Sequence, residues 1–291
     1  MLAYLLVSGL TTGSLYALMA IGLVVVYKAT RVVNFAHGEM FMLGGFIAYT
    51  LHVLARVPYV PALAAAVVAT LLLGVVTERL AYRPLIHAPA VSLVLAAVGF
   101  SYVLRGTARE IWGGRGDYIP FPPLVQAEPI AVGSVLIVPQ QLVVLGGALA
   151  CMALFTAFFN LTRAGKMLQA TAENPKAARL VGIRVERVHA FTWGVGAAAA
   201  GAAAALMAPL TLIYPDVGAV LLVKAFAAAV LGGLGSLPGA VLGGFAIGLI
   251  ENLAGGYLHT SLQDVSAFVV IMLVLIARPS GLLGGAPVRR V

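Results

Sequence analysis

The sequence predicts an all-α protein, a polytopic bundle of transmembrane helices that forms a single domain over residues 1–291. Of these residues, 62% are hydrophobic and only 10% are charged, whereas the apolar fraction of soluble domains is about 45–50%. The mean hydropathy is +1.03. Several apolar runs also reach roughly 20 residues, the length that a helix needs to cross a bilayer.

Apolar windows of that length predict nine spans. They cover residues 3–27, 37–55, 59–79, 91–111, 138–160, 188–208, 217–231, 237–255 and 264–277. Glycine and proline interrupt the run "LGGLGSLPGAVLGG" at residues 231–244, where two half-helices or a re-entrant segment would fit as well. We therefore expect about 8–10 crossings, with broken or re-entrant helices as the alternative at this point.

The distribution of basic residues predicts the orientation. Residues 1–20 contain no Lys or Arg, and the first span lacks the pattern of a cleaved signal peptide, so we expect a retained helix with the N-terminus outside. Nine spans then place the C-terminus and 13 of the 18 basic residues on one side, which the positive-inside rule identifies as the cytoplasm. The net charge of +8 thus follows from topology, and we expect no nucleic-acid partner. These basic residues are Lys28, Arg31, Arg79, Arg83, Arg163, Lys166, Lys176, Arg179, Arg184, Arg187, Arg278, Arg289 and Arg290.

The external loop at residues 112–137 contains Gly, Pro and Asp turn residues between short alternating pieces. It is too small for a domain. A docking site for an external partner and a cap on the helix bundle are equally compatible with it.

The largest cytoplasmic loop, residues 163–187, is predicted to hold a short helix. Asn174 followed by Pro175 is typical of a helix start, and Gly182 is a matching stop. We expect Ala177, Ala178 and Val181 to share one flat face that another protein could approach, while Lys176 and Arg179 point elsewhere. The alternative is a solvated basic loop that only sets the topology.

The string "ATAENPKAARLVGI" in this loop resembles the cytoplasmic coupling loop of permease subunits in bacterial ABC importers, and more narrowly the branched-chain amino acid permease family. Three other stretches are similar to the same family. They are "GLTTGSLYALMAIGLVVVYKATRVVNFAHGEMFMLGGF" at 9–46, "KAFAAAVLGGLGSLPGAVLGGFAIGLIE" at 224–251 and "RPSGLLG" at 278–284.

The resemblance implies a non-catalytic permease subunit in a bacterial inner membrane. Its expected partners are a homologous second permease, usually a different chain, two cytoplasmic ATPases and an external solute-binding protein. The sequence contains no Gly-x-x-x-x-Gly-Lys-Ser/Thr phosphate loop, so we expect this chain to bind no cofactor and its partners to bind ATP and Mg²⁺. The implied substrates are branched-chain or related small amino acids, or similar small polar solutes. The implied ATPase-coupling residues are Glu173, Asn174, Ala177, Ala178 and Gly182.

Polar residues within spans are candidates for the pathway, since a charge at membrane depth is costly and usually faces a bundle interior or a cavity. Lys224 could extend to the outer surface, pair with Glu251 or face the permeation route. Asn34, His37 and Glu39 are expected at the cytoplasmic mouth of the second span, with Asn34 as a helix cap and the His-Gly-Glu turn as a structural or gating hinge. No metal site is expected, because His37 and Glu39 point apart on a helix and no third ligand is evident.

Two other classes of function remain open. A membrane-embedded enzyme would need a Ser-His or paired-Asp arrangement on neighbouring spans, and the sequence has none that we can identify. An ATP-independent secondary transporter or channel would be compatible with broken helices. Co-purification of an ATPase would discriminate against that alternative.

Overall fold

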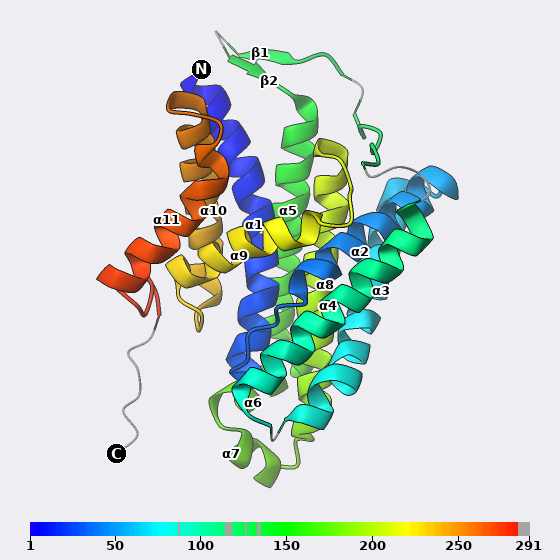
Figure 1. Ribbon diagram of the computed structural model, residues 1–291, viewed down its shortest axis with the longest axis vertical. Helices are drawn as coiled ribbons and strands as arrows, with labels where there is room; N and C mark the ends of the chain where they lie inside the picture. The colour runs from blue at the N-terminus through cyan, green and yellow to red at the C-terminus, as the bar shows by residue number, and fades with distance from the viewer. Residues whose placement is uncertain (87, 114–117, 126, 133–134, 285–291) are drawn as a thin grey trace.

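The computed structural model is an elongated helical bundle and describes residues 1–86, 88–113, 118–125, 127–132 and 135–284 (Figure 1). Arg289, Arg290 and parts of the external loop, which carried predictions above, lie outside the described residues. The α-helices are α1 (Leu2–Thr30), α2 (His37–Tyr49), α3 (Tyr59–Thr77), α4 (Ala90–Trp112), α5 (Pro139–Leu161), α6 (Arg163–Glu173), α7 (Pro175–Leu180), α8 (Val185–Met207), α9 (Val217–Gly232), α10 (Leu237–Tyr257) and α11 (Leu262–Ala277). Shorter elements are the π-helices η1 (Thr50–Leu54) and η2 (Glu78–Tyr82), the 3₁₀ turns η3 (Arg83–Leu85) and η5 (Ala208–Leu210), and the hairpin strands β1 (Ile130–Val132) and β2 (Val135–Ile137).

The predicted all-α polytopic bundle is confirmed. Among the described residues, six helical stretches are long and apolar enough to cross a membrane: Leu2–Thr30, Tyr59–Leu85, Val91–Trp112, Pro139–Leu161, Val185–Leu210 and Leu237–Tyr257. The other three predicted spans form shorter helices. α2 has 13 residues and is continued by η1, while α9 and α11 have 16 residues each, about 24 Å at 1.5 Å per residue.

The glycine- and proline-rich run at residues 231–244 separates two helices. α9 ends at Gly232, Gly233 adopts a φ of 102°, and α10 begins at Leu237 with the Ser236 hydroxyl accepting the Gly239 N–H. Residues 231–244 therefore form the end of α9, a tight turn and the start of α10, in agreement with the separate spans predicted at 217–231 and 237–255. Two further irregular segments precede the short helices α2 and α9, at residues 31–36 and 211–216.

The helices form two halves of inverted orientation, a feature that the sequence did not reveal. α1 through α4 correspond in order to α8 through α11, and α1 and α8 run in opposite directions (Figure 1). The packing is reciprocal, because α1 lies against α10 and α9 while α8 lies against α3 and α2. The two leading helices cross at Gly22 and Gly196, where a Cβ added to Gly22 would lie 2.5 Å from the Gly196 carbonyl oxygen. α1 and α8 are thus the buried centre of the bundle.

Candidate functional site

The loop predicted to couple to a partner lies at the end of the bundle opposite the N-terminus (Figure 1). Asn174 Oδ1 accepts hydrogen bonds from the backbone N–H groups of Lys176 and Ala177, at 3.1 and 3.0 Å. Pro175 is the first residue of α7, and Gly182 has a φ of 84° after its end. The predicted start and stop of this short helix are confirmed.

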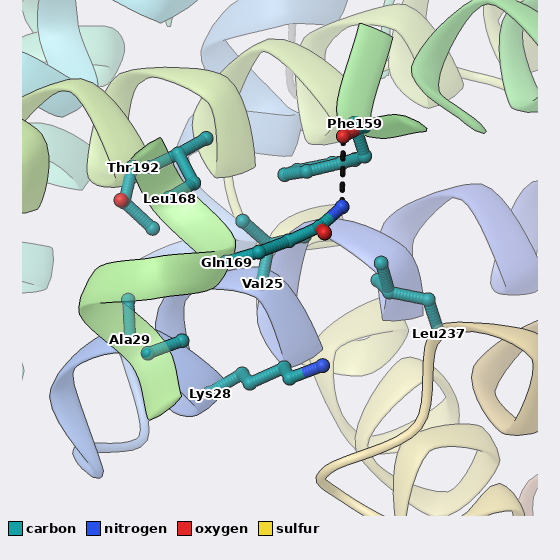
Figure 2. A pocket seen from close by; sticks show the side chains of 9 residues that line it. Val25, Lys28, Ala29, Phe159, Leu168, Gln169, Thr192 and Leu237 are labelled. Carbon is teal, nitrogen blue, oxygen red and sulfur yellow. Dashed lines mark hydrogen bonds between the residues drawn. The ribbon is translucent and has the colours of Figure 1, made fainter. Parts of the chain in front are cut away.

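A second helix that was not predicted, α6, joins this loop to the bundle. The Thr162 hydroxyl caps its start by accepting the Gly165 N–H at 3.0 Å. Figure 2 shows Gln169 of α6 donating to the Phe159 carbonyl of α5, at 2.8 Å, beside a small cavity of about 30 Å³. Lys28 of α1 and Thr192 of α8 line the same cavity. α6 therefore rests on α1, α5 and α8 together.

The expected flat face of α7 is wrong in one respect. Ala178 is buried against its own chain, at 3% exposure, because α7 packs on the start of α8 and the Ile183 N–H closes the loop onto the Ala178 carbonyl. Ala177 is exposed, and so are Glu173, Asn174 and Gly182. The apolar side chains that α7 and its end present are instead Leu180, at 90% exposure, and Val181, at 76%.

The cluster of Asn34, His37 and Glu39 lies inside the bundle, so its expected position at the cytoplasmic mouth is wrong. All three side chains are buried. Residues 31–36 fold back along α1, and His37 Nε2 lies 3.1 Å from the Met19 carbonyl oxygen, near the middle of that helix. Asn34 does not cap α2, since Oδ1 accepts the Ala36 N–H within the preceding turn and Ala36 is the N-cap.

The buried Glu39 carboxylate belongs to a charged network that the sequence analysis missed. Arg105 of α4 donates to Glu39 Oε1 at 2.5 Å and also lies 3.3 Å from Asp216 Oδ1, while Arg109 donates to Asp216 Oδ2 at 2.8 Å. Arg105 and Arg109 share a face of α4 because they are four residues apart. That spacing was the signal available in the sequence. It could not identify the partners, which come from α2 and from the N-cap of α9.

A second network joins the short helix α9 to its neighbours. Lys224 Nζ lies 2.5 Å from Glu251 Oε1 of α10 and 3.3 Å from Asp264 Oδ1 of α11. Of the alternatives open for Lys224, pairing with Glu251 is therefore observed. Lys224 also lies over the ring of Tyr16, 5.8 Å from its centroid, and Tyr16 is at the midpoint of α1. Asp264 was not among the predicted residues.

Several of these charged side chains are exposed on one face of the bundle. The side chain of Asp264 is 78% exposed, that of Arg109 57% and that of Asp216 49%. Their helices, α4, α9 and α11, all lie toward the viewer in Figure 1. Asp264 pairs with Lys224 of α9, which lies over Tyr16 at the midpoint of α1. This face therefore presents charge at the depth of the helical core, where contact with lipid tails would be costly.

The external loop packs on the bundle in the part that is described. Ile119 pairs with Ile213 through two backbone hydrogen bonds of 2.8 and 2.9 Å, and Phe121 is buried beside His52 and Tyr59. This arrangement favours the cap, and docking of an external partner stays a prediction. Within the described residues, no group of three or more His, Cys, Asp or Glu side chains is arranged to hold a metal ion.

The chain is similar to known transport proteins over nearly its full length. Residues 5–277 match the family described as "Branched-chain amino acid transport system / permease component". The high-affinity branched-chain amino acid transport system permease protein BraD of Pseudomonas aeruginosa is 36% identical over 297 residues, covering 98% of this chain and 97% of that protein. LivH of Escherichia coli K12, with the same description, is 35% identical over 98% of this chain and 96% of its own. A probable LivH of Methanocaldococcus jannaschii is 30% identical over 93% and 89%.

Removing Lys224 should destabilise the bundle, because it leaves the buried Glu251 carboxylate without a counter-charge. We expect Lys224→Met to lower the free energy of unfolding by about 3–5 kcal/mol, and Lys224→Met with Glu251→Leu to recover most of that loss. Thermal or denaturant unfolding in detergent measures both variants. Arg179→Met, which breaks the exposed pair with Glu186, is the control and should cost far less, because solvent screens an exposed ion pair. An equally small effect for Lys224→Met would contradict a buried ion pair.

Proposed function

Because this chain belongs to the family of branched-chain amino acid transport permease components, we propose that it is the membrane subunit of an ATP-driven importer in a bacterial inner membrane. It is a multi-pass transport protein. Residues 163–187 receive movement from separate ATPases. The observation that carries this proposal is the exposed apolar tip of α7 on a helix pair that is fastened to three spans.

The geometry of this tip suits a partner that moves. A two-turn helix is marginal in water on its own, yet α7 is held by the Asn174 cap and by the Arg179–Glu186 ion pair of 2.9 Å. Leu180 and Val181 project from it and would be covered when a cytoplasmic ATPase docks. Glu173 and Asn174 are exposed beside them. Displacement of α7 would pass through α6 to α1, α5 and α8.

The proposed partner subunits would supply the ATP binding and the second half of the pathway. Its sequence contains no phosphate loop, so two ATPase subunits would bind ATP and Mg²⁺, and this chain would bind no cofactor. A homologous second permease would cover the face of α4, α9 and α11, and a solute-binding protein would deliver the solute at the opposite end. This covering removes Asp264, Arg109 and Asp216 from lipid and places them beside an aqueous route.

The mixed charge of that face supports a zwitterionic solute. Asp264 and Asp216 could approach an ammonium group, and Arg109 a carboxylate. A branched-chain amino acid carries both groups on a small apolar body, and the relatives are described as branched-chain amino acid permeases. We therefore propose these amino acids as the substrate class.

Leu180→Asp should abolish co-purification of the ATPase subunits while the chain still inserts, because it places a charge in the apolar contact. Leu258→Asp, at the end of α10, changes a similarly exposed leucine (74% against 90%) and should leave the complex intact. Ala178→Arg is unsuitable for this test, since Ala178 is buried in its own loop. Full recovery of the complex with Leu180→Asp would remove the coupling role of α7. Failure to recover any ATPase with the wild-type chain would favour an ATP-independent secondary transporter or channel.

The proposed orientation places the N-terminus outside and the C-terminus in the cytoplasm. Tyr118 lies in the external loop and is 62% exposed, so Tyr118→Cys in a Cys151→Ser background should react with a membrane-impermeant thiol reagent on intact cells. Labelling that occurs only after permeabilisation would reverse the topology.

Water access to the proposed pathway is measurable by the same chemistry. In the Cys151→Ser background, Asp264→Cys should react with a charged thiol reagent at least about tenfold faster than Leu154→Cys, because a thiolate forms readily only in a polar environment. Leu154 is 69% exposed on α5 but lines an apolar groove. Equal rates would show that the α11 face is no wetter than the lipid-facing side.

A further inference from the structure

A crevice of about 90 Å³ lies among the ends of α1, α3, α4 and α8, apart from the proposed pathway. Its polar and aromatic lining consists of Thr30, Glu78, Tyr82, Arg83, His189 and Trp193. These residues come from the end of the bundle that carries α7, as the positions of α6 and α7 in Figure 1 indicate.

The Glu78 carboxylate is buried in this crevice, with Arg83 as an ion-pair partner but with one oxygen that receives no hydrogen bond among the described residues. The residue is 4% exposed, and among the described residues Oε2 has no hydrogen-bond partner. Oε1 lies 3.7 Å from Arg83 Nε, beyond hydrogen-bonding distance. An ionised carboxylate in such surroundings requires donors, and leaving it without them is costly.

A second acceptor lies in the same crevice. His189 Nε2 also has no partner among the described residues, and it accepts a hydrogen bond when the neutral ring carries its proton on Nδ1. Tyr82 and Trp193 form an aromatic wall, with ring centroids 3.9 Å apart. Carboxylate, imidazole and aromatic faces together match an ammonium group, which has three donors and a positive charge that rings attract.

We propose that this crevice binds the primary ammonium group of a small ligand, with Glu78 as its counter-ion, His189 as a second acceptor and Trp193 as its aromatic wall. The group could come from a free amine or amino acid in the adjoining aqueous phase, or from an ethanolamine lipid headgroup. Both sources supply the same –NH₃⁺ chemistry.

The crevice is linked to the coupling helix by a short chain of contacts. Arg83 Nη2 donates to the Glu186 carbonyl at 3.2 Å, and Arg179 of α7 donates to the Glu186 carboxylate at 2.9 Å. An ammonium group bound at Glu78 would compete with Arg83 for the Glu78 carboxylate. Arg83 would then shift, and its hydrogen bond to the Glu186 carbonyl would change. This consequence for transport rests on the proposed function, whereas binding itself does not.

Fluorescence of Trp193 provides a direct test. The chain has two tryptophans, so Trp112→Phe leaves Trp193 alone as the reporter in the full chain, reconstituted in nanodiscs of phosphatidylcholine and phosphatidylglycerol. Ethanolamine should produce a saturable change in emission. Glu78→Gln should weaken its apparent affinity about tenfold or more, as expected for loss of a charge-assisted hydrogen bond, and Glu110→Gln, at an exposed glutamate of α4, should leave it unchanged.

The ligand supplies a control that needs no further variant. Ethylene glycol, which lacks the ammonium group, should produce no saturable change. An equal response to ethylene glycol, no response to ethanolamine, or unaltered affinity in Glu78→Gln would each overturn the proposal.

With phosphatidylethanolamine added to the nanodiscs, a Glu78-dependent shift in Trp193 emission that blocks binding of free ethanolamine would support the site and identify the lipid headgroup as the ligand. Retained binding of free ethanolamine would support the site and identify a soluble ligand. Failure of the ATPase to co-purify would count against the proposed function but would leave these binding results unaffected.

Discussion

The meeting of α2 and α9 is the constraint on which the rest of the structure depends. Both short helices begin inside the bundle, where Gly38 and Gly218 touch through their backbones and an added Cβ would lie 2.3 or 2.1 Å from the facing carbonyl oxygen. Two helix N-termini brought together repel, since each carries partial positive charge. Glu39 in the first turn of α2 and Asp216 before α9 offset that charge, and Arg105 joins the two carboxylates.

This arrangement explains how the outer helices are held. α4 packs loosely on its own half, and Arg105 and Arg109 tie it to the meeting point of α2 and α9. α11 is tied in the corresponding way, by Asp264 to Lys224 of α9. In each half the fourth helix is thus fastened by an ion pair to the short second helix, with the sign of the charges exchanged. An ion pair of this kind can be broken without repacking the apolar core.

The two ends of the molecule are joined by its most buried helices. α6 lies on α1 and α8, and these same helices pack against α9 and α2. Small residues at their crossing, Gly22 and Gly196, let the two backbones approach closely. Under the proposed coupling, a displacement of α7 would be passed by these packed helices to the α2 and α9 junction, and with it to the charged face of α4, α9 and α11.

The sequence by itself determined the helical class, the long spans, the Asn174 and Gly182 boundaries of α7 and the family resemblance, because apolar run length and backbone capping are local properties. It also named Lys224 and Glu251 among the candidates. Only the tertiary structure decided that Ala178 is buried, that Glu39 lies in the core and that Arg105 is its partner. Those facts depend on which segments meet in the folded bundle. A local sequence pattern does not show which helices pack together. Glu39 and Arg105, for example, are separated by 66 positions in the chain, and only the packing of α2 and α4 brings them into contact.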